Sequence, residues 1–75
     1  MTYKVGQIYF CKVIKRYLRI DSIVEEGRLY KIKEYNQGRW DRFSTHAVKK
    51  DLDENVRELT KEEKRAMIKK TLKNG

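Results

Sequence analysis

Residues 28–43 read RLYKIKEYNQGRWDRF, and the way this stretch folds back on itself decides which side chains face the core. Short runs of aliphatic and aromatic residues on either side of Asn36, Gln37 and Gly38 predict two antiparallel strands joined by a tight hairpin. Strand side chains alternate between the two faces of a sheet, so a shift of one residue in the pairing exchanges the faces of all of them. The register must therefore be settled before any surface is assigned.

Two registers compete for this hairpin. A three-residue loop sets Ile32 against Arg42 and gains one cross-strand ion pair, worth at most about 1 kcal/mol. A two- or four-residue loop puts Tyr35 opposite Trp40 and brings Ile32 and Phe43 together inside, where each is worth roughly 1.5–3 kcal/mol of burial. Because burial is the larger contribution, we predict the second register.

In this register the outer face of the hairpin mixes basic and aromatic side chains. Lys33 lies opposite Arg42, a like-charge pair that a bound anion would relieve. Sheet-based readers of single-stranded nucleic acid stack bases on aromatic rings and neutralise phosphates with Lys and Arg. The candidate binding residues, in the hairpin and in the C-terminal segment, are Lys31, Lys33, Tyr35, Arg39, Trp40, Arg42, Lys69, Lys70 and Lys73. The structural alternative is that Tyr35 and Trp40 form a packed pair beneath a C-terminal helix.

The residues before this hairpin also have the composition of strands, rich in Ile, Val, Tyr, Phe and Leu. We expect strands over about 7–15, 17–24, 28–35 and 39–44, with a turn at 25–27. The first is apolar in both phases, which is typical of a strand that is sandwiched or strongly curved, as in a small barrel.

The pattern changes after Ser44. Ser44 or Thr45 is a candidate cap for a single helical or 3₁₀ turn that would turn Val48 and Leu52 inward. A short closing strand is expected around Val56.

Thr60 and Glu63 form a capping box, T-x-x-E, which predicts a helix through residues 60–75. Acidic residues lie near its start, lysines near its end, and Asn74-Gly75 is the candidate C-cap. Its narrow apolar stripe consists of Met67, Ile68 and Leu72. Such a helix either packs on the sheet or projects as a basic arm. Docking is favoured because short helices are marginal alone in water.

The net charge of +8 is unevenly distributed along the 75 residues. Residues 1–50 carry +7, residues 51–59 carry −3 and residues 60–75 carry +4. A basic excess of this size indicates a polyanionic partner, either nucleic acid or an acidic protein surface. The alternative is a solvated basic surface that only keeps the protein soluble.

The chain offers little for catalysis or metal binding. His46 is the only histidine and lacks partners at metal-ligand spacing, and Cys11 lies in an apolar run where an inert buried thiol is expected. The acidic residues at 51, 53 and 54 indicate a solvated joint. We therefore expect no enzyme, cofactor or metal. A single cysteine, no signal peptide and no membrane-spanning run predict a cytoplasmic protein without membrane contact.

The run VGQIYFCKVIKRYLRIDSIVEEGRLYKIKEYNQGRWDRFSTHAVKKDL resembles a small SH3-like barrel, with an opening V-G-x-x-Y strand, short strands and a tight distal hairpin. The resemblance implies a β-rich α+β fold, a curved antiparallel sheet of about four to five strands in residues 1–59 and one basic helix in residues 60–75. Small phage and mobile-element proteins look similar. We expect a non-enzymatic nucleic-acid-binding module, or alternatively a small phage-type regulator or inhibitor docking on an acidic surface of a host enzyme.

Overall fold

A computed structural model describes residues 2–74, with side chains through Met67. In this part of the chain a six-stranded antiparallel sheet is accompanied by two short helices. In chain order the elements are β1 (Ile8–Cys11), β2 (Arg16–Glu25), β3 (Leu29–Asn36), β4 (Arg39–Trp40), β5 (Thr45–Val48), α1 (Lys49–Asn55), β6 (Val56–Glu58) and α2 (Lys61–Asn74). The class is the predicted β-rich α+β, with more strands than the four to five expected.

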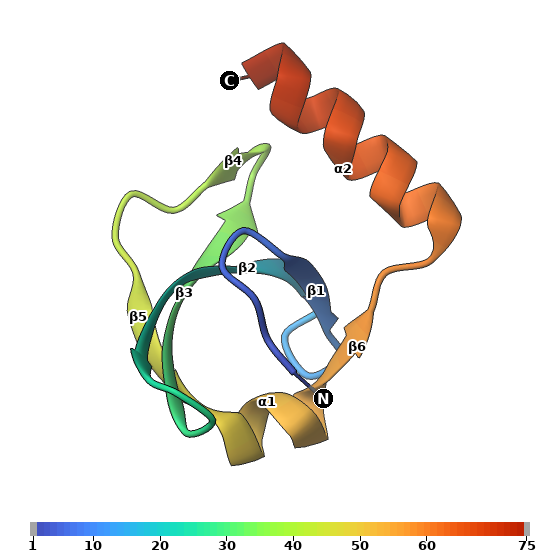
Figure 1. Cartoon of the computed structure of the whole chain (residues 1–75). Helices are drawn as coiled ribbons and strands as arrows, with labels where there is room; N and C mark the ends of the chain where they lie inside the picture. The colour runs from blue at the N-terminus through green and yellow to red at the C-terminus, as the bar shows by residue number, and fades with distance from the viewer. Residues whose placement is uncertain (1, 75) are drawn as a thin grey trace.

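The sheet curls without closing (Figure 1). Its strands run in the order β4-β3-β2-β1-β6, and β5 pairs with the first half of β3. Two register shifts between β2 and β3, at Ile20/Ser22 and Ile23/Glu25, bend this pair, because an extra residue on one strand increases its local twist. The curled, unclosed sheet is compatible with the SH3-like fold that the sequence resembles.

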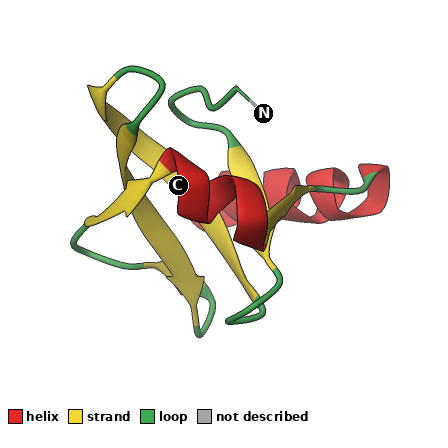
Figure 2. Ribbon diagram, turned by 90° about the horizontal axis from the view of Figure 1, so that it is seen from below, coloured by secondary structure: helices red, strands yellow, loops and turns green. Residues whose placement is uncertain are grey.

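The core fills the inside of the curl. Tyr3, which precedes β1, packs edge-on against Tyr9 and Tyr30, with ring centroids 5.1 and 5.4 Å apart. The buried cluster consists of Tyr3, Tyr9, Cys11, Leu18, Ile20, Tyr30, Ile32, Leu52 and Val56. Figure 2, seen from below, shows α1 lying across one end of the sheet, where it contributes Leu52. Leu59 and Met67 are also buried, outside this cluster.

The first strand is shorter than predicted. It ends at Cys11, which pairs with Arg16, so residues 12–15 form the turn and Lys15 takes a positive φ of 55°. Val13 and Ile14 are exposed in that turn. The strand is apolar in both phases because Phe10 packs on the outer face while Tyr9 faces the core.

The hairpin register is half right. Tyr35 pairs with Trp40 as predicted, but β4 ends there and Ile32 pairs with Thr45 of β5. The predicted pairing of Ile32 with Phe43 is wrong, since Phe43 is 78% exposed. The predicted pairing of Lys33 with Arg42 is also wrong, because residues 41–44 loop out of the sheet. One further bond, from the Asp41 N–H to the Glu34 carbonyl at 2.8 Å, closes the hairpin.

The segment after Ser44 is partly as predicted. Residues 45–48 form a strand rather than a helical turn, and Val48 is exposed, not inward. Leu52 is buried on α1, and β6 is the expected closing strand at Val56.

The capping box is confirmed. The Glu63 N–H donates to Thr60 Oγ1 at 3.1 Å, and the Thr60 N–H donates back to Glu63 Oε1 at 2.9 Å. Met67 of the predicted apolar stripe is buried. The side chains of Ile68 and Leu72 lie outside the described part of the chain, as does Gly75 of the proposed C-cap.

Candidate functional site

One row of aromatic side chains runs across the outer face of the sheet. Phe10 of β1 pairs with Tyr17 of β2, and Tyr35 of β3 pairs with Trp40 of β4. Leu18 is paired with Glu34, so Tyr17 and Tyr35, one residue further along, lie on the same face of neighbouring strands. We call these four residues the outer row: Phe10, Tyr17, Tyr35 and Trp40. All four are partly buried.

The rings of the outer row interact as two edge-to-face pairs. Phe10 and Tyr17 have ring centroids 5.3 Å apart, and Tyr35 and Trp40 have theirs 5.1 Å apart. An arginine covers each pair: the Arg57 guanidinium lies 4.5 Å from the centre of Phe10, and that of Arg19 lies 4.8 Å from the centre of Trp40. These distances are in the range of cation–π contacts.

The beginning of α2 is anchored at the Phe10–Tyr17 end of the row. Glu63 accepts hydrogen bonds from Arg57 Nη1 at 2.7 Å, from Arg57 Nη2 at 3.0 Å and from the Tyr17 hydroxyl at 3.0 Å. Met67 lies one turn further along the same helix face, because residues four apart are neighbours on a helix, and it is 2% exposed. Through Glu63, the first turn of α2 is hydrogen-bonded to β6 and β2. Figure 1 shows the helix outside the curl, running from β6 toward the side of β4.

This anchor shifts the pKa of two groups. Hydrogen bonds from Arg57, and then from the Thr60 backbone, lower the pKa of Glu63 from 4.5 to about 2. Desolvation, followed by the hydrogen bond to Glu63, raises the pKa of Tyr17 above its ordinary value. Glu63 is therefore a carboxylate and Tyr17 a neutral donor at physiological pH.

The Trp40 end of the row carries the cations predicted from the hairpin. Lys31 and Lys33 share the outer face with Tyr35, since β3 keeps its alternation. Lys33 lies opposite Arg19, and its Nζ is 3.8 Å from Asp21 Oδ1.

Arg39 pairs with Asn36 at the tip of the hairpin and is exposed, and Arg42 is exposed in the loop after β4. The side chains of Lys69, Lys70 and Lys73 lie outside the described part.

Most cations at this end are not engaged with acids. Among residues whose side chains are described, no ion pair is formed by Lys31, Arg19, Arg39 or Arg42. By contrast, Arg57 is paired with Glu63 and Arg16 with Glu34. The Trp40 end is therefore the part of the outer face with unneutralised positive charge.

Sequence reasoning missed Arg19, Phe10, Tyr17 and Arg57. The first three lie in the outward phase of β1 and β2. Residues 12–15 are predicted as strand because Val13 and Ile14 are apolar, but they form the turn that sets Phe10 opposite Tyr17. In the sequence Arg57 lies in the acidic joint between Glu54 and Glu58, and no local signal indicates the pairing of β1 with β6 that sets it opposite Phe10.

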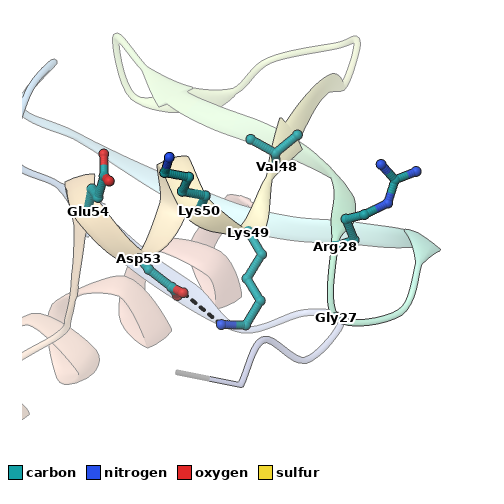
Figure 3. Close-up of a pocket in the computed structure, with 7 residues that line it drawn as sticks. All are labelled: Gly27, Arg28, Val48, Lys49, Lys50, Asp53 and Glu54. Atoms are coloured by element: carbon teal, nitrogen blue, oxygen red, sulfur yellow. Dashed lines mark hydrogen bonds and ion pairs between the residues drawn. The ribbon is translucent and has the colours of Figure 1, made fainter.

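A second feature of the surface is an open hollow of about 420 Å³ between the β2–β3 turn and α1 (Figure 3). It is lined by Gly27, Arg28, Val48, Lys49, Lys50, Asp53 and Glu54. Lys49 Nζ is 2.6 Å from Asp53 Oδ2, and Arg28 is paired with Glu25 outside the hollow. The charges in this hollow are of both signs, and Lys49 is already paired with Asp53, which makes it a weaker candidate than the outer row.

Within residues 2–74 no group of His, Cys, Asp and Glu side chains is arranged to hold a metal ion. None of the helices described there has the length and apolar character needed to cross a membrane. Comparisons with protein-family models, with curated proteins and with solved structures found no match to the chain. The outer row and its arginines therefore have to be interpreted from their own geometry.

Proposed function

We propose that this protein is a non-enzymatic nucleic-acid-binding module that binds through the Trp40 end of its outer row. The observation that carries the proposal is the Arg19–Trp40 pair: a partly exposed indole with a guanidinium 4.8 Å from its centre and no acid paired to that arginine in the described structure. A base can stack on such a ring while the cations beside it neutralise phosphates.

The charges around Trp40 support the proposal further. Arg19 and Lys33 lie opposite each other across β2 and β3, where like charges are mutually destabilising. Only part of this repulsion is offset, by the 3.8 Å contact of Lys33 with Asp21. A phosphate between them would remove the rest, so the free protein is better arranged for an anion than for water alone.

The proposal predicts salt-dependent quenching of Trp40, the only tryptophan, during titration with a short oligonucleotide. Each neutralised phosphate contributes roughly −0.7 to the slope of log affinity against log salt for a single strand. Four contacts, from Arg19, Lys31, Arg39 and Arg42, would give a slope of about −3. Fluorescence titrations between 50 and 300 mM salt measure it.

Arg42→Gln should flatten this slope by about 0.7. Lys12→Gln is the matched control, because Lys12 is also an exposed cation and is located in the β1–β2 turn. An affinity that is indifferent to salt, or equal losses in both variants, would contradict binding at the Trp40 end.

A second candidate function, a small phage-type protein-binding regulator or inhibitor, has one observation in its favour. Ile23, Val24 and Val48 are all exposed where β2 and β5 flank β3 at the end of the sheet away from Trp40. Exposed apolar side chains suit a protein partner better than a polyanion. A cytosolic protein retained stoichiometrically after nuclease treatment, and lost in an Ile23→Ser variant, would favour this function.

A further inference from the structure

The path of the chain after β4 leaves the Phe43 side chain exposed to solvent. Strand β4 ends at Trp40, residues 41–44 loop outward, and pairing with β3 resumes at Thr45. Phe43 is consequently 78% exposed, the most exposed of the large hydrophobic residues described. An isolated exposed apolar residue is common, so its surroundings decide whether it has a role.

Those surroundings repeat the arrangement at Trp40. The Arg42 guanidinium lies 5.9 Å from the centre of the Phe43 ring, as that of Arg19 lies 4.8 Å from Trp40. Neither arginine has an acidic partner among the described side chains. Two aromatic rings, each with an unneutralised arginine beside it, thus lie three residues apart in one hairpin and its loop.

The pair of Phe43 with Arg42 favours a single-stranded nucleic acid over a duplex as the ligand. In a duplex each base is stacked between its neighbours, and its flat face is not available to a side chain. Unpaired bases expose that face, and aromatic rings with nearby cations bind them with little sequence preference. Resting on the function proposed above, we propose that Phe43 with Arg42 forms a second stacking position beside Trp40 with Arg19, and that the ligand is a single-stranded nucleic acid.

Binding of three oligonucleotides of equal length tests this: an oligothymidylate, an oligouridylate and a mixed-sequence DNA duplex, at one moderate salt concentration. Phe43→Ala should weaken single-strand binding about tenfold and leave duplex binding unchanged, since base–aromatic stacking has about this effect. Phe43→Leu should behave like Phe43→Ala, because leucine keeps an apolar contact but has no ring. The two single strands separate DNA from RNA as the source of the bases.

Val13→Ala is the matched control, since Val13 is 68% exposed on a lysine-containing turn and has no ring. It should bind within twofold of the unaltered protein. Both Phe43 variants should fold, because the side chain lies outside the core.

Four outcomes would overturn the inference. Full affinity of Phe43→Leu would show an apolar contact without stacking. An equal loss of duplex binding would exclude a single-strand ligand. Unchanged single-strand binding by Phe43→Ala, with Trp40 still quenched and the salt slope intact, would overturn the second stacking position and leave the proposed function standing. Absence of binding to any oligonucleotide would overturn both.

Discussion

Glu63 connects three parts of the molecule through one carboxylate. It caps its own helix at Thr60, accepts two hydrogen bonds from Arg57 of β6 and one from Tyr17 of β2. A bidentate arginine pair with further donors is stronger than an ordinary surface ion pair, because the geometry is fixed at both ends. The attachment of α2 to the sheet depends heavily on this residue.

Stability should therefore fall in acid through Glu63. Its folded pKa of about 2 lies below the ordinary 4.5, so its contribution is present above pH 4.5 and is lost as the pH falls toward 2. Glu63→Gln should lower the free energy of unfolding at pH 7 by about 1–3 kcal/mol and flatten its decline between pH 4.5 and 2. Urea unfolding at several pH values measures both.

The control for this prediction is Glu62→Gln, which removes an exposed carboxylate from the same helical turn. Its stability should stay within about 0.5 kcal/mol of the unaltered protein. The decline in acid will not vanish in Glu63→Gln, since Lys49, and then Tyr3, also lower the pKa of Asp53. A decline of unchanged steepness would contradict the assignment.

At the level of single residues, the sequence predicted the cross-strand pair Tyr35–Trp40 but not the side chains from other strands that surround it. The burial argument chose the register that pairs Tyr35 with Trp40, and this pairing is confirmed, although the contact of Ile32 with Phe43 on which the argument rested is not formed. The arginine over Trp40 comes from β2, and only the register of another strand pair brings it there. The sequence thus predicts a candidate surface at the hairpin, but Arg19 and Phe43 join it only through long-range strand pairing and a loop.

Among the elements, α1 is the short helix that covers one end of the curled sheet. It joins β5 to β6 across the end of the curl and presents Leu52, its one buried residue, to the core (Figure 2). Its first turn has no side-chain cap at Val48, so its stability comes from packing and from the Lys49–Asp53 pair. A helix this short does not persist without such contacts.

Leu52→Ala should accordingly cost about 2–5 kcal/mol of unfolding free energy, the usual range for deleting a large buried aliphatic side chain. Val48→Ala should cost well under 1 kcal/mol, because Val48 is 40% exposed. Thermal or urea unfolding of the two variants compares them directly. Equal costs would mean that α1 does not insert Leu52 into the core.

Elements that a local sequence signal marks were predicted from the sequence, and elements without such a signal were not. The capping box fixed the start of α2, and Val56 marked β6. A helical turn is expected over residues 46–50 because Ser44 and Thr45 are good caps, yet pairing with β3 makes residues 45–48 a strand, and the helix α1 begins only at Lys49. Tertiary pairing overrides a weak local preference in a segment of four residues.

For the whole molecule, we expect two levels of stability: a higher one for the sheet and a lower one for α2. The sheet is held by the buried cluster, whereas α2 is attached through the hydrogen bonds of Glu63 with Arg57 and Tyr17. Regions with few buried contacts open at lower free energy than the core. The predicted boundary at residues 59 and 60 is therefore expected to be a boundary in stability as well.

Two measurements on Glu63→Ala test this boundary. Amide hydrogen exchange should become faster in residues 61–74. Labelling of Cys11, a buried core thiol, should stay as slow as in the unaltered protein. Simultaneous acceleration of both would show that helix and sheet open as one cooperative unit.

The bond between the Tyr3 hydroxyl and Asp53 Oδ1, 2.6 Å long, joins residues 50 positions apart. During synthesis at about 5–20 residues per second, Asp53 is added roughly 2.5–10 seconds after Tyr3. In that interval the Tyr3 hydroxyl lacks its hydrogen-bond partner Asp53, and β1 also lacks its neighbouring strand β6. These contacts of Tyr3 and β1 therefore form only after Asp53 and β6 have been synthesised, later than the pairings of β1 with β2 and of β2 with β3 become available.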